Sequence, residues 1–312
     1  MAVNDKISAS DYNSIRDAVN TVYGTGSGQY GYGQTLQSPA IVEGNSISIN
    51  EWTALQYDII NTGVHQTGTI PSLISVAEGD TVRYDPTGTT APITQYRPLI
   101  DTYNSNRFSL GDGQYLTNTK ASTSMIWPGP DGDHWQTYIY TTMTVKWSTA
   151  DAARYFFNSG GQIRIASSRI PSGGGSSPAQ NQSWTDFLTT VGIKTFAATS
   201  PAINFYNLTN SFQQYYSANA SGAYSRNYFK LSAKCNTVSN NSSGTENTLV
   251  FLIEWHDDYV RSSGWSTLDR IQGTFTVDAS TLEATGILYP VGTGNFTVES
   301  PTITIADITQ SF

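Results

Sequence analysis

The chain has 312 residues, of which 13% are charged, and its formal net charge is −8 at pH 7. The average soluble domain carries about 25% charged residues; here neutral polar residues, 27 Gly and 19 Tyr take their place. The 16 basic residues are scattered, which argues against a groove for nucleic acid. No apolar run approaches the roughly 20 residues that cross a bilayer. This composition favours strands joined by tight turns.

An amphipathic helix is predicted directly after Ser10, which we place at the N-cap. Tyr12, Ile15 and Val19 recur at spacings of three and four residues and form one apolar stripe. Gly24 is the expected stop signal.

A second helix of the same kind is predicted about forty residues later. Asn50 is the expected N-cap, Trp52, Leu55 and Ile59 form the stripe, and Gly63 is the expected stop. We expect the two stripes to pack together, and their residues are the candidates for docking a partner protein.

The two helical segments match each other at an offset of 40 residues. The aligned pairs are Ile7 with Ile47, Ser8 with Ser48, Asp11 with Glu51, Tyr12 with Trp52, Ile15 with Leu55 and Val19 with Ile59. We therefore expect a helix-pair docking module over residues 1–66 and a β-rich body over residues 67–312, with a further division of the body near 195 as an alternative. The glycine-rich link between the helices, residues 24–38, is expected to be flexible or ordered only by assembly.

The body shows short alternating runs broken by Gly, Pro and Asn, which predict strands. Two short helices are predicted between them, ADAARYFFN, closed by Gly160 and Gly161, and SWTDFLTTVG, with Ser183 as N-cap. The expected fold is mainly β, a β-sandwich or jelly-roll-like body with a small helical module. The expected strands cover residues 81–84, 137–147, 161–168, 227–238, 248–259, 273–280 and 295–308.

One turn is a candidate metal site. Asp131, Asp133 and His134 could supply ligands, but Ca²⁺ takes six to eight oxygens and the distal Glu of an EF-hand is absent. A solvated turn is the better interpretation. No cofactor is expected.

No motif nominates a catalytic residue. His256 is followed by two aspartates, and the simplest interpretation is a strand that ends at a polar edge of its sheet. A glycosidase would need two carboxylates about 5–10 Å apart, and no pair stands out. Cys235, the only cysteine, lies in a strand pattern and is expected to be buried. The chain is therefore not expected to be an enzyme.

The aromatic residues allow a surface for sugar binding. Trp127 and Trp135 flank the turn with the candidate metal ligands, and an exposed ring there could contact a host glycan. The alternative is that such large rings fill the core.

Several segments resemble uncharacterised virion structural proteins of T4-like marine cyanophages. The resemblance is carried by NDKISASDYNSIRDAVNTVYGTGSGQYGYGQTLQS, NEWTALQYDIINTGVHQTG, TMTVKWSTADAARYFFNSGGQIRIASSR and SWTDFLTTVGIKTF. It covers roughly the first 65 residues and residues 141–196, and it carries no enzymatic motif.

This resemblance implies a place in the virion, in the tail, neck or baseplate, rather than a reaction. The implied partners are other virion proteins and further copies of the chain, with no nucleic acid and no membrane. A capsid decoration protein remains an alternative, and so does a receptor- or carbohydrate-binding module for host attachment.

Overall fold

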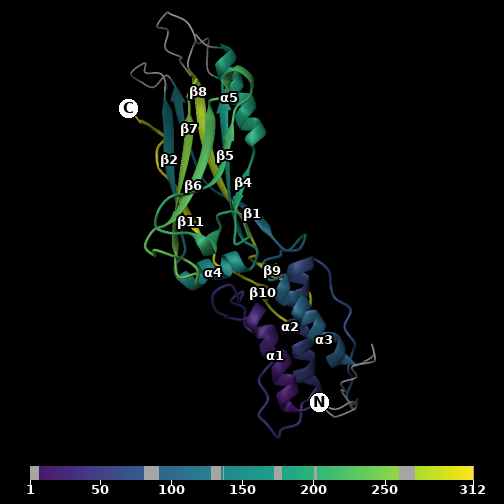
Figure 1. The fold of residues 1–312 in the computed structure, drawn as a ribbon. Coiled ribbons are helices and arrows are strands. Elements are labelled where there is room, and N and C mark those ends of the chain that lie inside the picture. Colours follow the sequence, from purple (N-terminus) through teal and green to yellow (C-terminus); the bar gives the residue numbers. More distant parts are fainter. Residues whose placement is uncertain are drawn as a thin grey trace, which may run out of the picture. The chain divides into compact units, whose positions relative to one another are not determined.

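The structure is a computed structural model that describes residues 7–80, 91–127, 135, 137–171, 178–199, 202–259 and 271–311. The chain divides into two compact units (Figure 1). The helix unit comprises Met1–Leu116, Asp151–Gly161 and Glu283–Ser300, and the sandwich unit comprises Thr117–Ala150, Gln162–Leu282 and Pro301–Phe312. These bounds differ from the expected division at residue 66, and residue 195 lies inside the sandwich unit.

The helix unit is built on three helices that run in the same direction. They are α1 (Ala9–Tyr23), α2 (Ile49–Thr67) and α3 (Pro92–Ser105). At their amino-terminal ends the Tyr12 hydroxyl donates to the Glu51 carbonyl at 3.0 Å, and Trp52 stacks on Tyr96. At their carboxy-terminal ends Gln66 donates to the Tyr103 carbonyl at 2.9 Å. Long connections between successive helices bring the chain back to the starting end.

The predicted stripes are buried inside this bundle. Tyr12, Ile15 and Val19 on α1 and their counterparts on α2 are at most 2% exposed, because α3 covers them with Ile93, Tyr96, Ile100 and Tyr103. Helix α3 lies in the segment that was expected to be β-rich. Pro98 inside the helix obscured a period that is otherwise regular.

Both N-caps lie two residues earlier than predicted, at Ser8 and Ser48. Gly24 ends α1 as predicted, whereas α2 continues past Gly63 to Gly68, which has a left-handed backbone with φ 74°. Gly63 is a packing residue, since a Cβ there would lie 2.2 Å from the Tyr103 hydroxyl.

The glycine-rich link is ordered within the chain, contrary to expectation. Arg154 on α4 (Ala150–Asn158) donates to the carbonyls of Thr25 and Tyr30, and Asn158 donates to those of Gly28 and Gly31. The helix α4 and its closing glycines agree with prediction.

Three separate segments meet around His65 near the end of α2. Its ring stacks on Phe296 at 4.0 Å between centroids and contacts Tyr32 at 4.7 Å. Its Nε2 lies 3.0 Å from the Ser159 carbonyl. Phe296 belongs to the small hairpin of β9 (Ile287–Leu288) and β10 (Asn295–Phe296).

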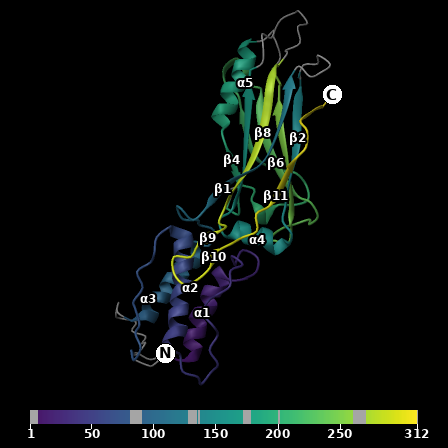
Figure 2. The same cartoon turned by 180° about the vertical axis from the view of Figure 1, so that it is seen from behind.

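The sandwich unit contains two sheets, as Figure 2 shows from behind, and confirms a β-rich body with a few helices. The four-stranded sheet has the order β1 (Leu116–Trp127), β8 (Gly273–Glu283), β3 (Gln162–Ile170), β4 (Lys194–Phe196). The six-stranded sheet contains, in order, β11 (Thr302–Ile305), β2 (Tyr138–Lys146), β7 (Thr248–His256), β6 (Tyr228–Cys235) and β5 (Gln213–Asn219), with β12 (Thr309–Ser311) also on β2.

Alternating side chains of the two sheets meet in one core. Phe196 contacts Phe251 at 5.2 Å between centroids, and the Trp255 indole donates to the Ser167 hydroxyl at 2.9 Å. Helix α5 (Pro178–Val191) adds Trp184 to this core and begins five residues before the predicted N-cap Ser183.

The predicted hairpin of β6 and β7 is confirmed. Its loop is held by the buried Glu246 carboxylate, which accepts from the backbone amides of Thr237, Val238 and Thr248.

The sandwich unit also contains two single 3-10 turns, Phe205–Asn207 and Gly222–Tyr224. The structure adds β1, β4, β5, β9 and β12 to the predicted strands, and the expected strand at 81–84 lies outside the described residues.

Candidate functional site

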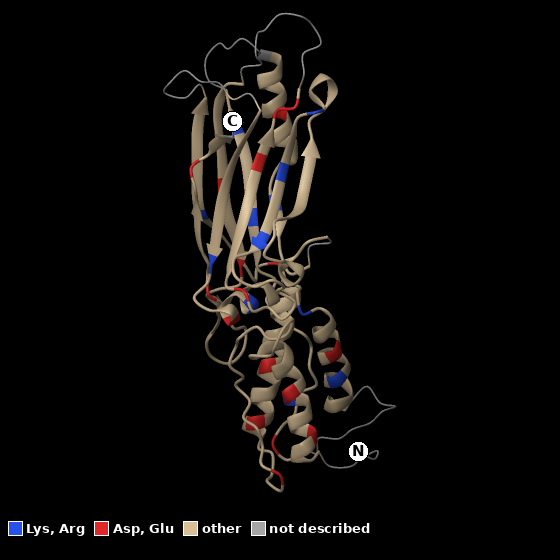
Figure 3. Cartoon of the chain, turned by 60° about the vertical axis from the view of Figure 1, so that its left-hand side comes forward, with Lys and Arg blue, Asp and Glu red and all other residues tan. Residues whose placement is uncertain are grey.

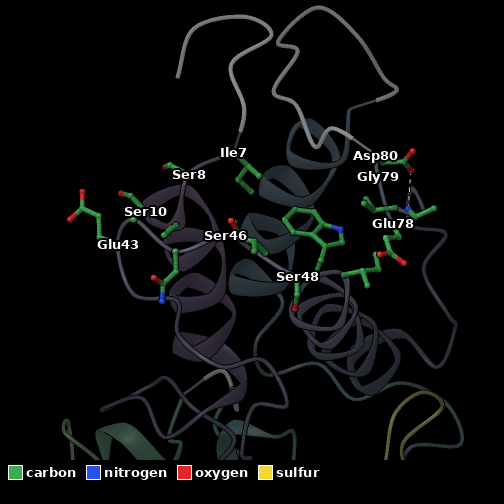
Figure 4. A pocket seen from close by; sticks show the side chains of 17 residues that line it. Ile7, Ser8, Ser10, Glu43, Ser46, Ser48, Glu78, Gly79 and Asp80 are labelled. Atoms are coloured by element: carbon green, nitrogen blue, oxygen red, sulfur yellow. Dashed lines mark hydrogen bonds between the residues drawn. The ribbon is translucent and has the colours of Figure 1, made fainter.

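A cavity of about 980 Å³ lies at the amino-terminal end of the helix bundle (Figure 4). The starts of α1 and α2 form its wall, and two loops complete it. The lining consists of Ile7–Ser10, Glu43–Ile49, Trp52 and Val76–Asp80.

Two matching capping boxes build the wall. The Ser8 hydroxyl accepts from the Asp11 amide at 3.2 Å while the Asp11 carboxylate accepts from the Ser8 amide at 3.1 Å. Ser48 and Glu51 repeat this pattern at 3.3 and 2.6 Å. Each N-cap is preceded by an isoleucine and followed four residues later by a buried aromatic ring, the spacing of a hydrophobic staple. The repeat at offset 40 is thus a repeated helix-start motif.

The cavity has an apolar floor. Trp52 is 2% exposed and stacks on Tyr96 with 5.6 Å between the ring centroids. Half-buried aliphatic side chains surround it, namely Ile7, Ile47, Ile49 and Val76.

The rim of the cavity is acidic. Figure 4 shows Glu43 on one side of the mouth and Glu78 and Asp80 on the other. All three residues are exposed, and Asp80 also accepts from the Ala77 amide at 2.8 Å. The nearby Arg97 lies 3.7 Å from Asp11. An apolar floor inside an acidic rim suits an apolar side chain that carries basic neighbours.

A second surface of interest is the outer face of the six-stranded sheet. Cross-strand pairing aligns Tyr138, His256 and Tyr228 in one row. The imidazole lies between the two phenol rings, at 4.9 and 4.2 Å between centroids and within 8° of parallel. Because the rings stack on one another, their edges point away from the sheet.

The next row contains Tyr140, Glu254 and Lys230. Lys230 Nζ lies 2.8 Å from the Glu254 carboxylate, which also lies 3.3 Å from His256 Nε2. Burial raises the pKa of Glu254, but its bonds to His256 and Lys230 outweigh burial and leave this pKa below its usual value. We call these two rows the tyrosine face.

The other sheet presents a different outer face. Most of its paired residues there are small or polar, such as Ser168 with Thr276 and Arg164 with Ser280, and Ile170 at the end of β3 is an exposed apolar residue. Figure 3 marks the positions of Lys and Arg in blue and of Asp and Glu in red. Tyrosine is enriched in binding surfaces because it offers a large rigid area with a polar end. The tyrosine face is therefore the sandwich surface best suited to recognition.

Two buried groups serve the fold of the helix unit. Burial lowers the pKa of His65 to about 3, so that its ring is neutral and Nε2 donates to the Ser159 carbonyl. Burial also raises the pKa of Asp58, which accepts from the amides of Gln37 and Ser38 and fixes the end of the glycine-rich link to α2.

The structure corrects several candidate residues. The stripe residues Tyr12, Ile15, Val19, Trp52, Leu55 and Ile59 are packed within the bundle, and of these six only Trp52 lines the cavity. Trp127 and Trp135 are 5% and 0% exposed, so the expectation of an exposed ring is wrong. Both rings are covered, and Trp135 packs against Trp184 and Phe275 in the core.

Other candidates have different outcomes. Asp131, Asp133 and His134 lie outside the described residues. His256 ends a strand, but β7 is central in its sheet, so the predicted polar edge is wrong. Cys235 is buried as expected. Over the described part of the chain, no group of three or more His, Cys, Asp or Glu could hold a metal ion.

Sequence reasoning missed both surfaces. The aligned pairs Ser8/Asp11 and Ser48/Glu51 are the sequence signal from which the helix starts that line the cavity could have been found. The tyrosine face has no such local signal, because it depends on strand register.

Within the described ranges, no helix has the length and apolar character needed to span a membrane. In comparisons with known proteins, no family model, no curated protein and no solved structure matches the chain.

Proposed function

We propose that this chain is a non-enzymatic structural protein of a bacteriophage particle, a component of the tail, neck or baseplate. It docks to a neighbouring virion protein through the amino-terminal end of its helix unit and displays its β-sandwich. The viral context comes from the cyanophage resemblance of its segments. The observation that carries the docking assignment is the cavity with its apolar floor and acidic rim.

Contacts within the helix unit support this choice of end. Ser159 and Phe296 contact His65 near the end of α2, and the Gly111 amide donates to the His65 carbonyl at 2.8 Å. The carboxy-terminal end of α2 is thus packed against other segments of the same unit, whereas the amino-terminal ends of α1 and α2 line the cavity.

The buried polar groups fit a structural role. Asp58, Glu246 and Arg154 each bond to backbone groups of loops, so their charges hold the fold in place. A partner segment for the cavity would carry an apolar residue flanked by Lys or Arg, which complement the rim.

Charge reversal at the rim tests the docking site. Phage assembled with the Glu43→Lys/Glu78→Lys chain should contain much less of it than wild-type particles, because the rim would repel a basic partner. Asp101→Lys, an exposed position on α3, is the matched control. The readout is quantitative mass spectrometry of purified particles. Equal incorporation of the rim variant and the control would overturn the docking assignment.

A capsid decoration protein shares these structural features. It differs in location, since it would be found on heads and not on tails. Mass spectrometry of separated heads and tails distinguishes the two roles. Recovery with tails supports our assignment, whereas recovery with heads replaces it by the decoration role.

The tyrosine face favours a second candidate of another class, a module that binds a host receptor or glycan. Tyr138→Ala and Tyr228→Ala should then each weaken phage adsorption to host cells. Ser168→Ala on the other outer face is the control. Binding of the purified protein to a glycan array is the direct measurement. Wild-type adsorption by both tyrosine variants would exclude this candidate.

A further inference from the structure

The edges of the two sheets differ in how they are protected. An open edge is a template for another strand, and proteins protect edges with short strands, bulges, charges or Pro. β4 has three residues, and β5 carries a register shift between Gln214 and Tyr216. The outer side of β2 is covered by β11 and β12, which have four and three residues. These edges are short or interrupted.

Among the edges that the described residues form, the edge of strand β1 has few of these protective features. It has twelve residues, LTNTKASTSMIW, with one charge at Lys120 and neither Pro nor Gly. It stands at the end of the strand order, with β8 as its neighbour in the sheet. Of its twelve residues, eleven are exposed or half-exposed, whereas its neighbour β8, with eleven residues, buries every second side chain. β1 is therefore a long accessible edge.

We propose that β1 is a self-association surface, at which β1 of a second copy of this chain adds in antiparallel orientation. The two four-stranded sheets would join about a two-fold axis into one continuous sheet. This inference rests on the sandwich unit and is independent of the cavity in the helix unit.

The features of β1 favour a second copy as the occupant. An edge strand offers its own copy the same row of N–H and C=O groups, so the antiparallel contact is self-complementary. The chain has a net charge of −8, which opposes contact between copies in general. β1 contains Lys120 and no acidic residue, so this contact brings no carboxylates of the two copies together. Small Ser, Thr and Ala side chains leave room for close approach of the two backbones.

Cysteine cross-linking tests this surface in the full chain. Cys235 is the only native cysteine and is buried, so a cross-link between copies must form through the introduced cysteine. The test variants are Thr119→Cys, Ser122→Cys and Ser124→Cys, all at exposed positions of β1. In an antiparallel self-pair, residues near the two-fold axis lie about 4.5–5.5 Å from their own copies between Cα atoms, which a disulfide can bridge.

The matched controls are Ser168→Cys on β3 and Gln214→Cys on β5, which are equally exposed strand positions. We expect a disulfide dimer on non-reducing gels for β1 variants, with a maximum at one position, and monomer for the controls. In the Ser122→Cys variant, adding Ser124→Lys should lower the yield of dimer, because antiparallel pairing about residue 122 places position 124 of one copy opposite Lys120 of the other, and like charges directly opposite one another are destabilising. Monomer at all three β1 positions, or dimer in equal yield at the controls, would overturn the proposal.

Discussion

The helix unit and the sandwich unit are stabilised by different kinds of contact. In the helix unit, polar side chains such as Arg154 and Asn158 hold the backbone of a glycine-rich link, and His65 joins three segments. In the sandwich unit, aromatic and aliphatic rows of two sheets pack face to face. A chain with few charges thus uses its polar groups to order loops and its apolar groups to pack sheets. The units should respond to different perturbations.

The largest effect is expected in the sandwich core. Phe251→Ala removes a ring that is 0% exposed and contacts Phe196 and Tyr215, and should destabilise the unit by about 3–5 kcal/mol. Amide hydrogen exchange in β2, β6 and β7 measures this loss. Leu252→Ala, on the half-exposed outer face, should cost about 1 kcal/mol or less. Similar losses for both variants would contradict the placement of the core.

Arg154→Ala tests the polar contacts of the helix unit. It leaves the Thr25 and Tyr30 carbonyls without their charged donor and should cost about 3 kcal/mol. We expect faster amide exchange in residues 24–38 and unchanged exchange in the sandwich strands. Arg97→Ala, whose side chain is 44% exposed, is the control. An unchanged link in Arg154→Ala would mean that other contacts order it.

Mild acid should weaken the helix unit selectively. The unfolded chain protonates His65 near pH 6.5, whereas burial lowers its folded pKa to about 3. The unfolded state therefore binds more protons between these values, and stability falls with falling pH, by about 2 kcal/mol from pH 7 to pH 5. Urea unfolding followed by amide exchange measures it. In His65→Gln this part of the pH dependence should disappear, and its persistence would assign the effect to another group.

The smallest effects concern the helix caps. Ser8→Ala and Ser48→Ala should each cost about 1 kcal/mol, because each removes the acceptor of a capping box. Ser10→Ala and Asn50→Ala should stay within about 0.5 kcal/mol. Thermal unfolding of the four variants compares them. Larger losses of stability in Ser10→Ala and Asn50→Ala than in Ser8→Ala and Ser48→Ala would support the N-caps predicted from the sequence.

The sequence predicted the local features of the fold well. Both apolar stripes, the Gly24 stop, α4 and the β6–β7 hairpin follow from periodicity and turn residues. The caps were displaced because Ser8 and Ser10 are both good N-caps, and only the paired Asp11 three residues after Ser8 distinguishes them. Helix α3 was missed because Pro98 interrupts its pattern.

The candidate site could not be derived from the sequence in the same way. Periodicity marks an apolar stripe but does not say what covers it, and here α3 covers the stripes that were expected to dock. The tyrosine face depends on the register of β2, β6 and β7, which are distant in sequence. Cross-strand contacts of this kind follow from tertiary pairing and not from local pattern.

The central claim is that the amino-terminal end of the helix unit docks in a phage particle. The most direct measurement is an electron cryo-microscopy map of intact particles in which the chain is traced. Our account predicts that Glu43, Glu78 and the floor around Trp52 lie against a basic and apolar segment of a neighbouring protein. A traced chain whose cavity faces solvent while another surface makes the contact would contradict it, as would particles that lack the chain.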